Sequence, residues 1–209
     1  MPFALQPVIL DYGNVLCPMP QPNDFEELAR TAGIQSTVFL QSLWRYRLDY
    51  DRGTLDGPAY WRQVAKENGK EFSEAQIRKL IEIDLGLWTR PGTTMLAWAR
   101  ALRKSGLKTS ILSNMPRDFS SYLRSNARWL SDFDFNVFSG ELGVVKPDPK
   151  IYQVCLKGLN TPPDQTLFID DLAANVDGAH AVGMKAIKFE SVGQLAADVQ
   201  AFGLPAPVD

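Results

Sequence analysis

Polar side chains follow four short apolar runs of this chain, and they are of only a few chemical types. They are three acids, a hydroxyl, an amide and a lysine, namely Asp11, Ser113, Asn114, Lys146, Asp170 and Asp171. Carboxylates repel one another, so a site that held the three acids would need positive charge; the lysine would supply one charge and a divalent metal the rest. Carboxylate and carbonyl oxygens, without imidazole or thiolate, suit Mg²⁺, which shares its coordination with a substrate phosphate.

Each of these segments also has a simple structural interpretation when it is taken alone. Residues 11–14 could form an ordinary turn, and residues 113–114 could cap the next helix. Residues 170–171 could lie at a helix N-terminus, stabilised by the helix dipole, and Lys146 could be a solvated loop residue. These interpretations explain poorly why all four segments follow strands in the same way. The coincidence favours one shared site.

The alternation of strands and helices predicts the fold that would bring these segments together. The first apolar run, PVILD, has no helical period and is typical of a buried strand. After residue 90, helical stretches alternate with strand-like runs, which are 107–112, 135–138, 166–169 and 184–189. This pattern predicts an α/β protein with a doubly wound, Rossmann-like parallel sheet covered on both faces. Ligands bind such sheets beyond the carboxyl ends of the strands.

A run of helices without strands separates the first strand from this alternating region. Apolar residues recur at helical spacing in four stretches, which are 23–32, 36–50, 57–68 and 73–87. Ser73, with Gln76 three positions on, predicts a capping box at the start of the last one. We therefore expect a core domain of residues 1–16 and 90–209, interrupted by a helical-bundle cap of residues 17–89.

The composition is typical of a globular protein of small net charge. Of 209 residues, 45% are hydrophobic, and 22 basic against 24 acidic residues leave a formal charge of −2. We expect no nucleic-acid partner, no membrane partner and a cytoplasmic location, as a monomer or a homodimer. Cys17 and Cys155 are expected to be reduced, packed thiols, and His180 to be structural or at the surface.

Four sequence motifs together resemble those of the haloacid dehalogenase superfamily. They are VILDYGNVL at 8–16, ILSN at 111–114, VVKPDP at 144–149 and FIDDLAAN at 168–175. The helical insertion directly after the first motif resembles members with an α-helical cap. The form DxGNV and the segment LWRYRLDYDRGTLDGPAYW resemble the subgroup that includes α-D-glucose-1-phosphate phosphatase.

This resemblance implies a role for each residue that matches a motif. Asp11 would be the nucleophile and would form an aspartyl-phosphate, which water then hydrolyses. Mg²⁺ would be held by Asp11, the backbone carbonyl of Gly13 and Asp170, with Asp171 acting through water or in support. The transferring phosphoryl group would be held by Ser113, Asn114 and Lys146.

One position departs from the family pattern. Most phosphatases of the superfamily carry a second Asp two residues after the nucleophile, as general acid and base, and this chain has Gly13 there. Because the metal contact at this position uses the backbone, we expect the Mg²⁺ site to survive and the proton donor to be lost. General acid catalysis is worth about 10² to 10⁴-fold, so we expect a preference for better leaving groups such as an anomeric sugar hydroxyl.

The predicted cap supplies the candidates for substrate recognition. Arg47 and Thr54 are expected to contact a small phosphorylated metabolite, a sugar phosphate in the first instance, together with Asn14 of the first motif. The turn at Gly53 is expected to reach toward the site. Trp44 and Trp61 are expected to be buried anchors of the helical bundle.

Two other functions stay open on the sequence. A 2-haloacid dehalogenase also uses an aspartate nucleophile on this fold, but it needs no metal, so the pair Asp170 and Asp171 tells against it. A catalytically silent binding protein would explain Gly13 as a sign of decay, although Asp11 and Lys146 are intact. Release of phosphate, release of halide or neither would distinguish the three.

Overall fold

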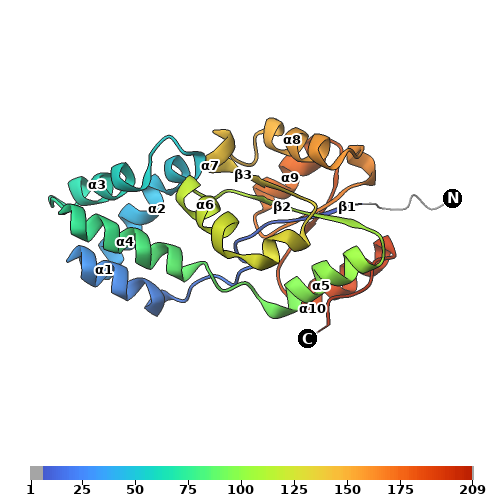
Figure 1. Cartoon of the computed structure of the whole chain (residues 1–209), viewed down its shortest axis with the longest axis horizontal. Helices are drawn as coiled ribbons and strands as arrows, with labels where there is room; N and C mark the ends of the chain where they lie inside the picture. The colour runs from blue at the N-terminus through green and yellow to red at the C-terminus, as the bar shows by residue number, and fades with distance from the viewer. Residues whose placement is uncertain (1–6, 209) are drawn as a thin grey trace.

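A five-stranded parallel sheet forms the centre of the molecule (Figure 1). The computed structural model describes residues 7–208, so residues 1–6 of the predicted core domain and Asp209 lie outside the described residues. The strands stand in the order β3-β2-β1-β4-β5, and each pairs in parallel with its neighbours. They are β1 (Pro7–Leu10), β2 (Lys108–Ser113), β3 (Phe135–Phe138), β4 (Leu167–Asp170) and β5 (Lys185–Lys188).

The central strand β1 is apolar because both of its faces are covered. Val8, Ile9 and Leu10 are each fully buried. Val8 and Leu10 belong to one hydrophobic cluster and Ile9 to another, as alternate residues of a strand must when helices pack on both sides. The predicted doubly wound α/β class is confirmed.

Helices from residue 93 onward form the two outer layers. Beside Leu10 pack α5 (Thr93–Lys104), α6 (Arg117–Asn126) and α10 (Val192–Asp198), with the short helices η2 (Arg128–Asp132) and η4 (Val199–Phe202). Beside Ile9 pack α8 (Pro149–Leu159) and α9 (Ala173–Ala181). The sequence did not predict α7 (Ser139–Leu142) or η3 (Pro163–Gln165), which are too short to show a period.

A helical insertion follows β1 and lies to the left of the sheet in Figure 1. It consists of η1 (Pro22–Phe25), α1 (Glu26–Ala32), α2 (Ser36–Arg52), α3 (Gly57–Glu67) and α4 (Glu74–Leu87). These helices share a hydrophobic cluster of their own, in which Trp61 is fully buried as predicted. The predicted capping box between Ser73 and Gln76 is present at the start of α4.

Two expectations about the insertion are wrong. Trp44 is 44% exposed and packs only edge-on against Phe25, so it is not a buried anchor. The turn at Gly53 packs against α7, since a Cβ on Gly53 would lie 2.9 Å from the Gly140 carbonyl oxygen. Thr54, beside it, is exposed.

The remaining expectations about single residues concern the cysteines and the histidine. Cys17 and Cys155 are buried free thiols, and His180 is exposed in the last turn of α9. Among residues 7–208, no helix is long and apolar enough to cross a membrane.

Candidate active site

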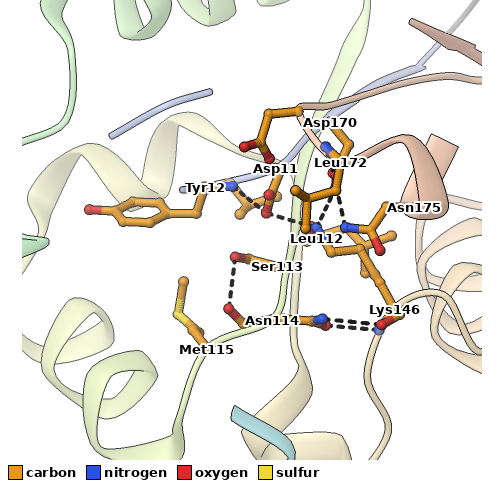
Figure 2. Close-up of polar contacts among 12 residues, drawn as sticks. Asp11, Tyr12, Leu112, Ser113, Asn114, Met115, Lys146, Asp170, Leu172 and Asn175 are labelled. Atoms are coloured by element: carbon orange, nitrogen blue, oxygen red, sulfur yellow. Dashed lines mark hydrogen bonds and ion pairs between the residues drawn. The ribbon is translucent and has the colours of Figure 1, made fainter. Parts of the chain in front are cut away.

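The ammonium group of Lys146 joins three neighbouring strand ends (Figure 2). Its Nζ lies 2.8 Å from Asp11 Oδ1 and 2.6 Å from Asp170 Oδ2, and it donates to the Leu112 carbonyl oxygen at 3.0 Å. The sheet register explains this convergence, because Leu10 of β1 pairs with Ile169 of β4 and with Ile111 of β2. The next residues along the chain are Asp11, Asp170 and Leu112. The three oxygen atoms that contact Lys146 Nζ therefore come from the same level of the sheet. Lys146 is only 3% exposed, so these contacts take the place of water.

Both aspartates of this group are fixed by further hydrogen bonds. The backbone N–H of Tyr12 donates to Asp11 Oδ1 at 2.7 Å. Asp170 Oδ1 accepts from the Leu172 backbone N–H and from Asn175 Nδ2, each at 2.9 Å. Asp170 is therefore held on both oxygens, one by Lys146 and the other by the Leu172 backbone and α9.

The side chain of Asn114 holds Lys146 in place by hydrogen bonds to the Lys146 backbone. Its amide Oδ1 accepts from the Lys146 N–H at 2.8 Å, and its Nδ2 donates to the Lys146 carbonyl oxygen at 3.2 Å. The side chain of Asn114 therefore clamps the lysine loop to the end of β2. Ser113, 2% exposed, precedes it and lines the same cavity.

Asp171 and Asn14 form a second pair at the edge of the group. Asn14 Nδ2 donates to Asp171 Oδ2 at 3.0 Å, and Asn14 has a φ of 58°, a left-handed conformation that asparagine tolerates. Asn14 was expected to bind substrate, but it is turned toward Asp171. Burial raises the pKa of Asp171, and the bond from Asn14 opposes that rise.

Burial and charge have opposite effects on the protonation of the central groups. Burial raises the pKa of Asp11 to about 7; Lys146 opposes the rise and the charge of Asp170 adds to it. Burial alone would lower the pKa of Lys146, but the carboxylates of Asp11 and Asp170 outweigh it and raise that pKa. The lysine therefore stays charged, while Asp11 lacks enough positive charge around it to ionise easily.

The donor set fits a divalent cation. One oxygen from each of Asp11, Asp170 and Asp171 can be chosen so that all three lie within 4.8 Å of one another. Three acids against one lysine leave an excess of negative charge in a site shielded from water, which a hard cation would neutralise. The three carboxylates could hold such an ion, and Gly13 lies in the same cavity wall as Asp11 and Asp171.

A cavity of about 390 Å³ opens above these residues. Of the predicted site residues, it is lined by Asp11, Gly13, Arg47, Ser113, Asn114, Lys146 and Asp171. Thr54, Asn14 and the fully buried Asp170 are not in its wall. Arg47 reaches the cavity but is occupied: its Nε lies 3.0 Å from Asp51 Oδ1 and its Nη1 lies 3.1 Å from Asp84 Oδ2.

The sequence interpretation missed most of the cavity wall. The missed residues are Tyr12, Met19, Trp44, Leu48, Asp51, Trp88, Met115, Phe119, Leu172 and Asn175. A signal for four of the lining residues was present, since positions 44, 47, 48 and 51 have the spacing of one helix face. Met115 and Leu172 directly follow predicted site residues at two strand ends.

Comparison with known proteins identifies the family. A family model described as haloacid dehalogenase-like hydrolase matches residues 4–183. The chain belongs to the haloacid dehalogenase-like hydrolases. This family membership bears out the resemblance of the four motifs to that superfamily.

Curated relatives include several phosphatases. The sesquiterpene phosphatase astK of Aspergillus oryzae is 28% identical over 178 residues, which cover 84% of this chain and 85% of that protein. The bifunctional epoxide hydrolase 2 of Sus scrofa is 35% identical over 97 residues, 44% of this chain and 18% of that protein. The match thus spans less than a fifth of the hydrolase's length.

Solved haloacid dehalogenase-like structures share the fold. An enzyme of this family from Bacteroides thetaiotaomicron, an aspartate-to-alanine mutant in complex with magnesium and inorganic phosphate, superimposes with a TM-score of 0.72 at 22% identity, covering 89% of this chain and 94% of that one. An L-2-haloacid dehalogenase from Xanthobacter autotrophicus superimposes with a TM-score of 0.66 at 21% identity, covering 94% and 83%. The fold is common to metal-bound enzymes and to dehalogenases.

The raised pKa of Asp11 predicts how stability depends on pH in the absence of metal. Because the folded protein binds a proton on Asp11 more readily than the unfolded chain does, stability falls as pH rises from about 4 to about 7. We expect Asp11→Asn to raise the free energy of unfolding by roughly 1 to 3 kcal/mol near pH 8, and by less near pH 5. Urea unfolding in EDTA measures this.

The matched control is Asp177→Asn, on the exposed surface of α9. It should show no comparable gain. An Asp11→Asn protein that was less stable than the wild type near pH 8 would contradict the charge excess described above.

Proposed function

We propose that this hydrolase is a Mg²⁺-dependent phosphatase that cleaves a small phosphate ester through an aspartyl-phosphate on Asp11. The observation that carries the proposal is the group of three carboxylates within 4.8 Å of one another around a single buried lysine. A metal-free hydrolase would gain nothing from this excess of negative charge. A site that binds a cation and a phosphate together would use all of it.

The described residues can carry out the two transfers in sequence. A carboxylate oxygen of Asp11 attacks phosphorus, and the bond from phosphorus to the alcohol oxygen breaks with its electron pair leaving on that oxygen. Water then attacks the same phosphorus, and the bond to Asp11 breaks, which restores the carboxylate and releases inorganic phosphate. Lys146 and Ser113 would neutralise and hold the phosphoryl oxygens during both steps.

When bound, Mg²⁺ would shield the carboxylate and the phosphate from each other, so that one anion can approach the other. Asp11, Asp170 and the Gly13 carbonyl would hold it, with Asp171 in support. Asp170 is held by a hydrogen bond from Asn175, and the Lys146 backbone donates to and accepts from the Asn114 side chain. The helical insertion would act as the cap that excludes water.

Relatives favour the phosphatase over the 2-haloacid dehalogenase. The sesquiterpene phosphatase astK matches 84% of this chain at 28% identity, and a glyceraldehyde 3-phosphate phosphatase of Pyrococcus furiosus is 34% identical over 93 residues, 43% of this chain and 38% of that protein. The sugar phosphate expected from the sequence stays a prediction. So does the likeness to the glucose-1-phosphate phosphatase subgroup.

The direct test is release of phosphate from an aryl phosphate and a set of alkyl and sugar phosphates, with Mg²⁺ and with EDTA. We expect metal-dependent release that falls by at least about 10³-fold in Asp11→Asn. Incubation with 2-chloropropionate should release no chloride. Release of chloride without metal would establish the dehalogenase, and binding of phosphate esters without any turnover would establish the silent binding protein.

Gly13 offers a gain-of-function test of the missing proton donor. A Cβ at this position would lie 3.7 Å from Trp88 Cζ3, an ordinary van der Waals distance, so a Cβ meets no clash there. We expect Gly13→Asp to raise kcat/KM for alkyl phosphates by at least about tenfold, because a poor leaving group then receives a proton, and to change aryl phosphate turnover little.

Gly13→Asn is the control, since it has the same shape and cannot donate an acidic proton. If the two variants behaved alike, the loss of a general acid at position 13 would not limit this enzyme.

A further inference from the structure

The cavity is lined by charged and polar side chains at the strand ends and mainly by apolar side chains elsewhere. Asp11, Ser113, Lys146 and Asp171 lie at the strand ends, where the phosphate would bind. The rest of the wall consists largely of apolar side chains from the insertion and the segments beside it, from α6 and from the loops after β2 and β4, which are Met19, Trp44, Leu48, Trp88, Met115, Phe119 and Leu172.

The apolar wall continues to the surface as an exposed rim. Met19 is 39% exposed, Trp44 44%, Leu48 47% and Leu172 56%. Only eight large hydrophobic side chains are this exposed among residues 7–208, and these four surround one opening. Exposed apolar side chains scattered singly need no explanation, but a cluster at the mouth of a cavity indicates a binding surface.

The charged side chains in the apolar part of the wall are already paired, and the unpaired indole nitrogen there is shielded from the cavity. Arg47 is paired with Asp51 and Asp84. The indole nitrogen of Trp88 is buried, so Trp88 presents ring carbons to the cavity. Sugar hydroxyls placed here would lose their hydrogen bonds to water and would meet few free partners, which is costly.

We propose that the alcohol part of the substrate is apolar, so that the enzyme hydrolyses the phosphate monoester of a hydrocarbon alcohol. This inference rests on the proposed phosphatase function. At about 30 Å³ for each water-sized group, a volume of about 390 Å³ holds roughly 13 such groups, enough for a phosphoryl group and a short hydrocarbon. A longer chain would lie across the rim formed by Met19, Trp44, Leu48 and Leu172.

A comparison of n-octyl phosphate with glucose 6-phosphate tests this substrate class. Both are esters of primary alcohols, and octanol is the poorer leaving group, so intrinsic reactivity does not favour it. We expect a higher kcat/KM for octyl phosphate, measured below its micelle concentration. In the series ethyl, butyl and octyl phosphate, kcat/KM should rise about two- to fourfold for each methylene until the wall is covered.

Substitution of the rim tests where the chain binds. Leu48→Ser should lower the ratio of kcat/KM for octyl phosphate to that for ethyl phosphate by about fivefold or more. The matched control is Leu142→Ser on α7, a leucine 38% exposed that is not in the cavity wall. It should leave this ratio unchanged.

The outcomes separate this inference from the proposed function. A flat alkyl series, with glucose 6-phosphate turned over as well as octyl phosphate or better, would overturn the apolar substrate and leave the phosphatase standing. Metal-dependent hydrolysis that rises with chain length would support both. No phosphate release from any ester, the aryl phosphate included, would overturn both.

Discussion

The contact of one buried ammonium group with two buried carboxylates is the constraint on which the rest of this site depends. Lys146 lies within 3 Å of both Asp11 and Asp170 and is almost completely shielded from water. Removing Lys146 would leave two carboxylates in the interior without a counter-charge, which is strongly destabilising. The sheet order places β1 between β2 and β4 and thereby brings the three acceptors of the lysine to one level.

The same contact leaves the site with fewer positive charges than carboxylates. One lysine cannot balance three acids, so burial keeps the pKa of Asp11 near 7 until more positive charge arrives. A cation that binds Asp11 and Asp170 would make Asp11 a carboxylate just where a phosphate also binds. We propose that the charged floor and the apolar wall divide the cavity into a part for the phosphoryl group and a part for the alcohol.

The sequence predicted the floor of the site much better than its wall. Asp11, Ser113 and Asp170 follow apolar strands directly, so a parallel sheet must bring them to one edge, and the family motifs assign Lys146 to the same place. The wall depends on how α2 rotates against the sheet, which composition and spacing do not determine. Trp44 was therefore expected inside the bundle and Thr54 in the site, although one face of α2 carries Trp44 into the cavity and Thr54 lies outside it.

The central claim is that Asp11 forms a covalent bond to phosphorus. Its most direct test is a single turnover with enzyme in excess over an aryl phosphate and Mg²⁺, quenched in acid and analysed by peptide mass spectrometry. The account predicts a transient peptide that contains Asp11 and has gained the mass of one phosphoryl group, and that is absent in EDTA. Rapid phosphate release with no modified peptide at any time would contradict it.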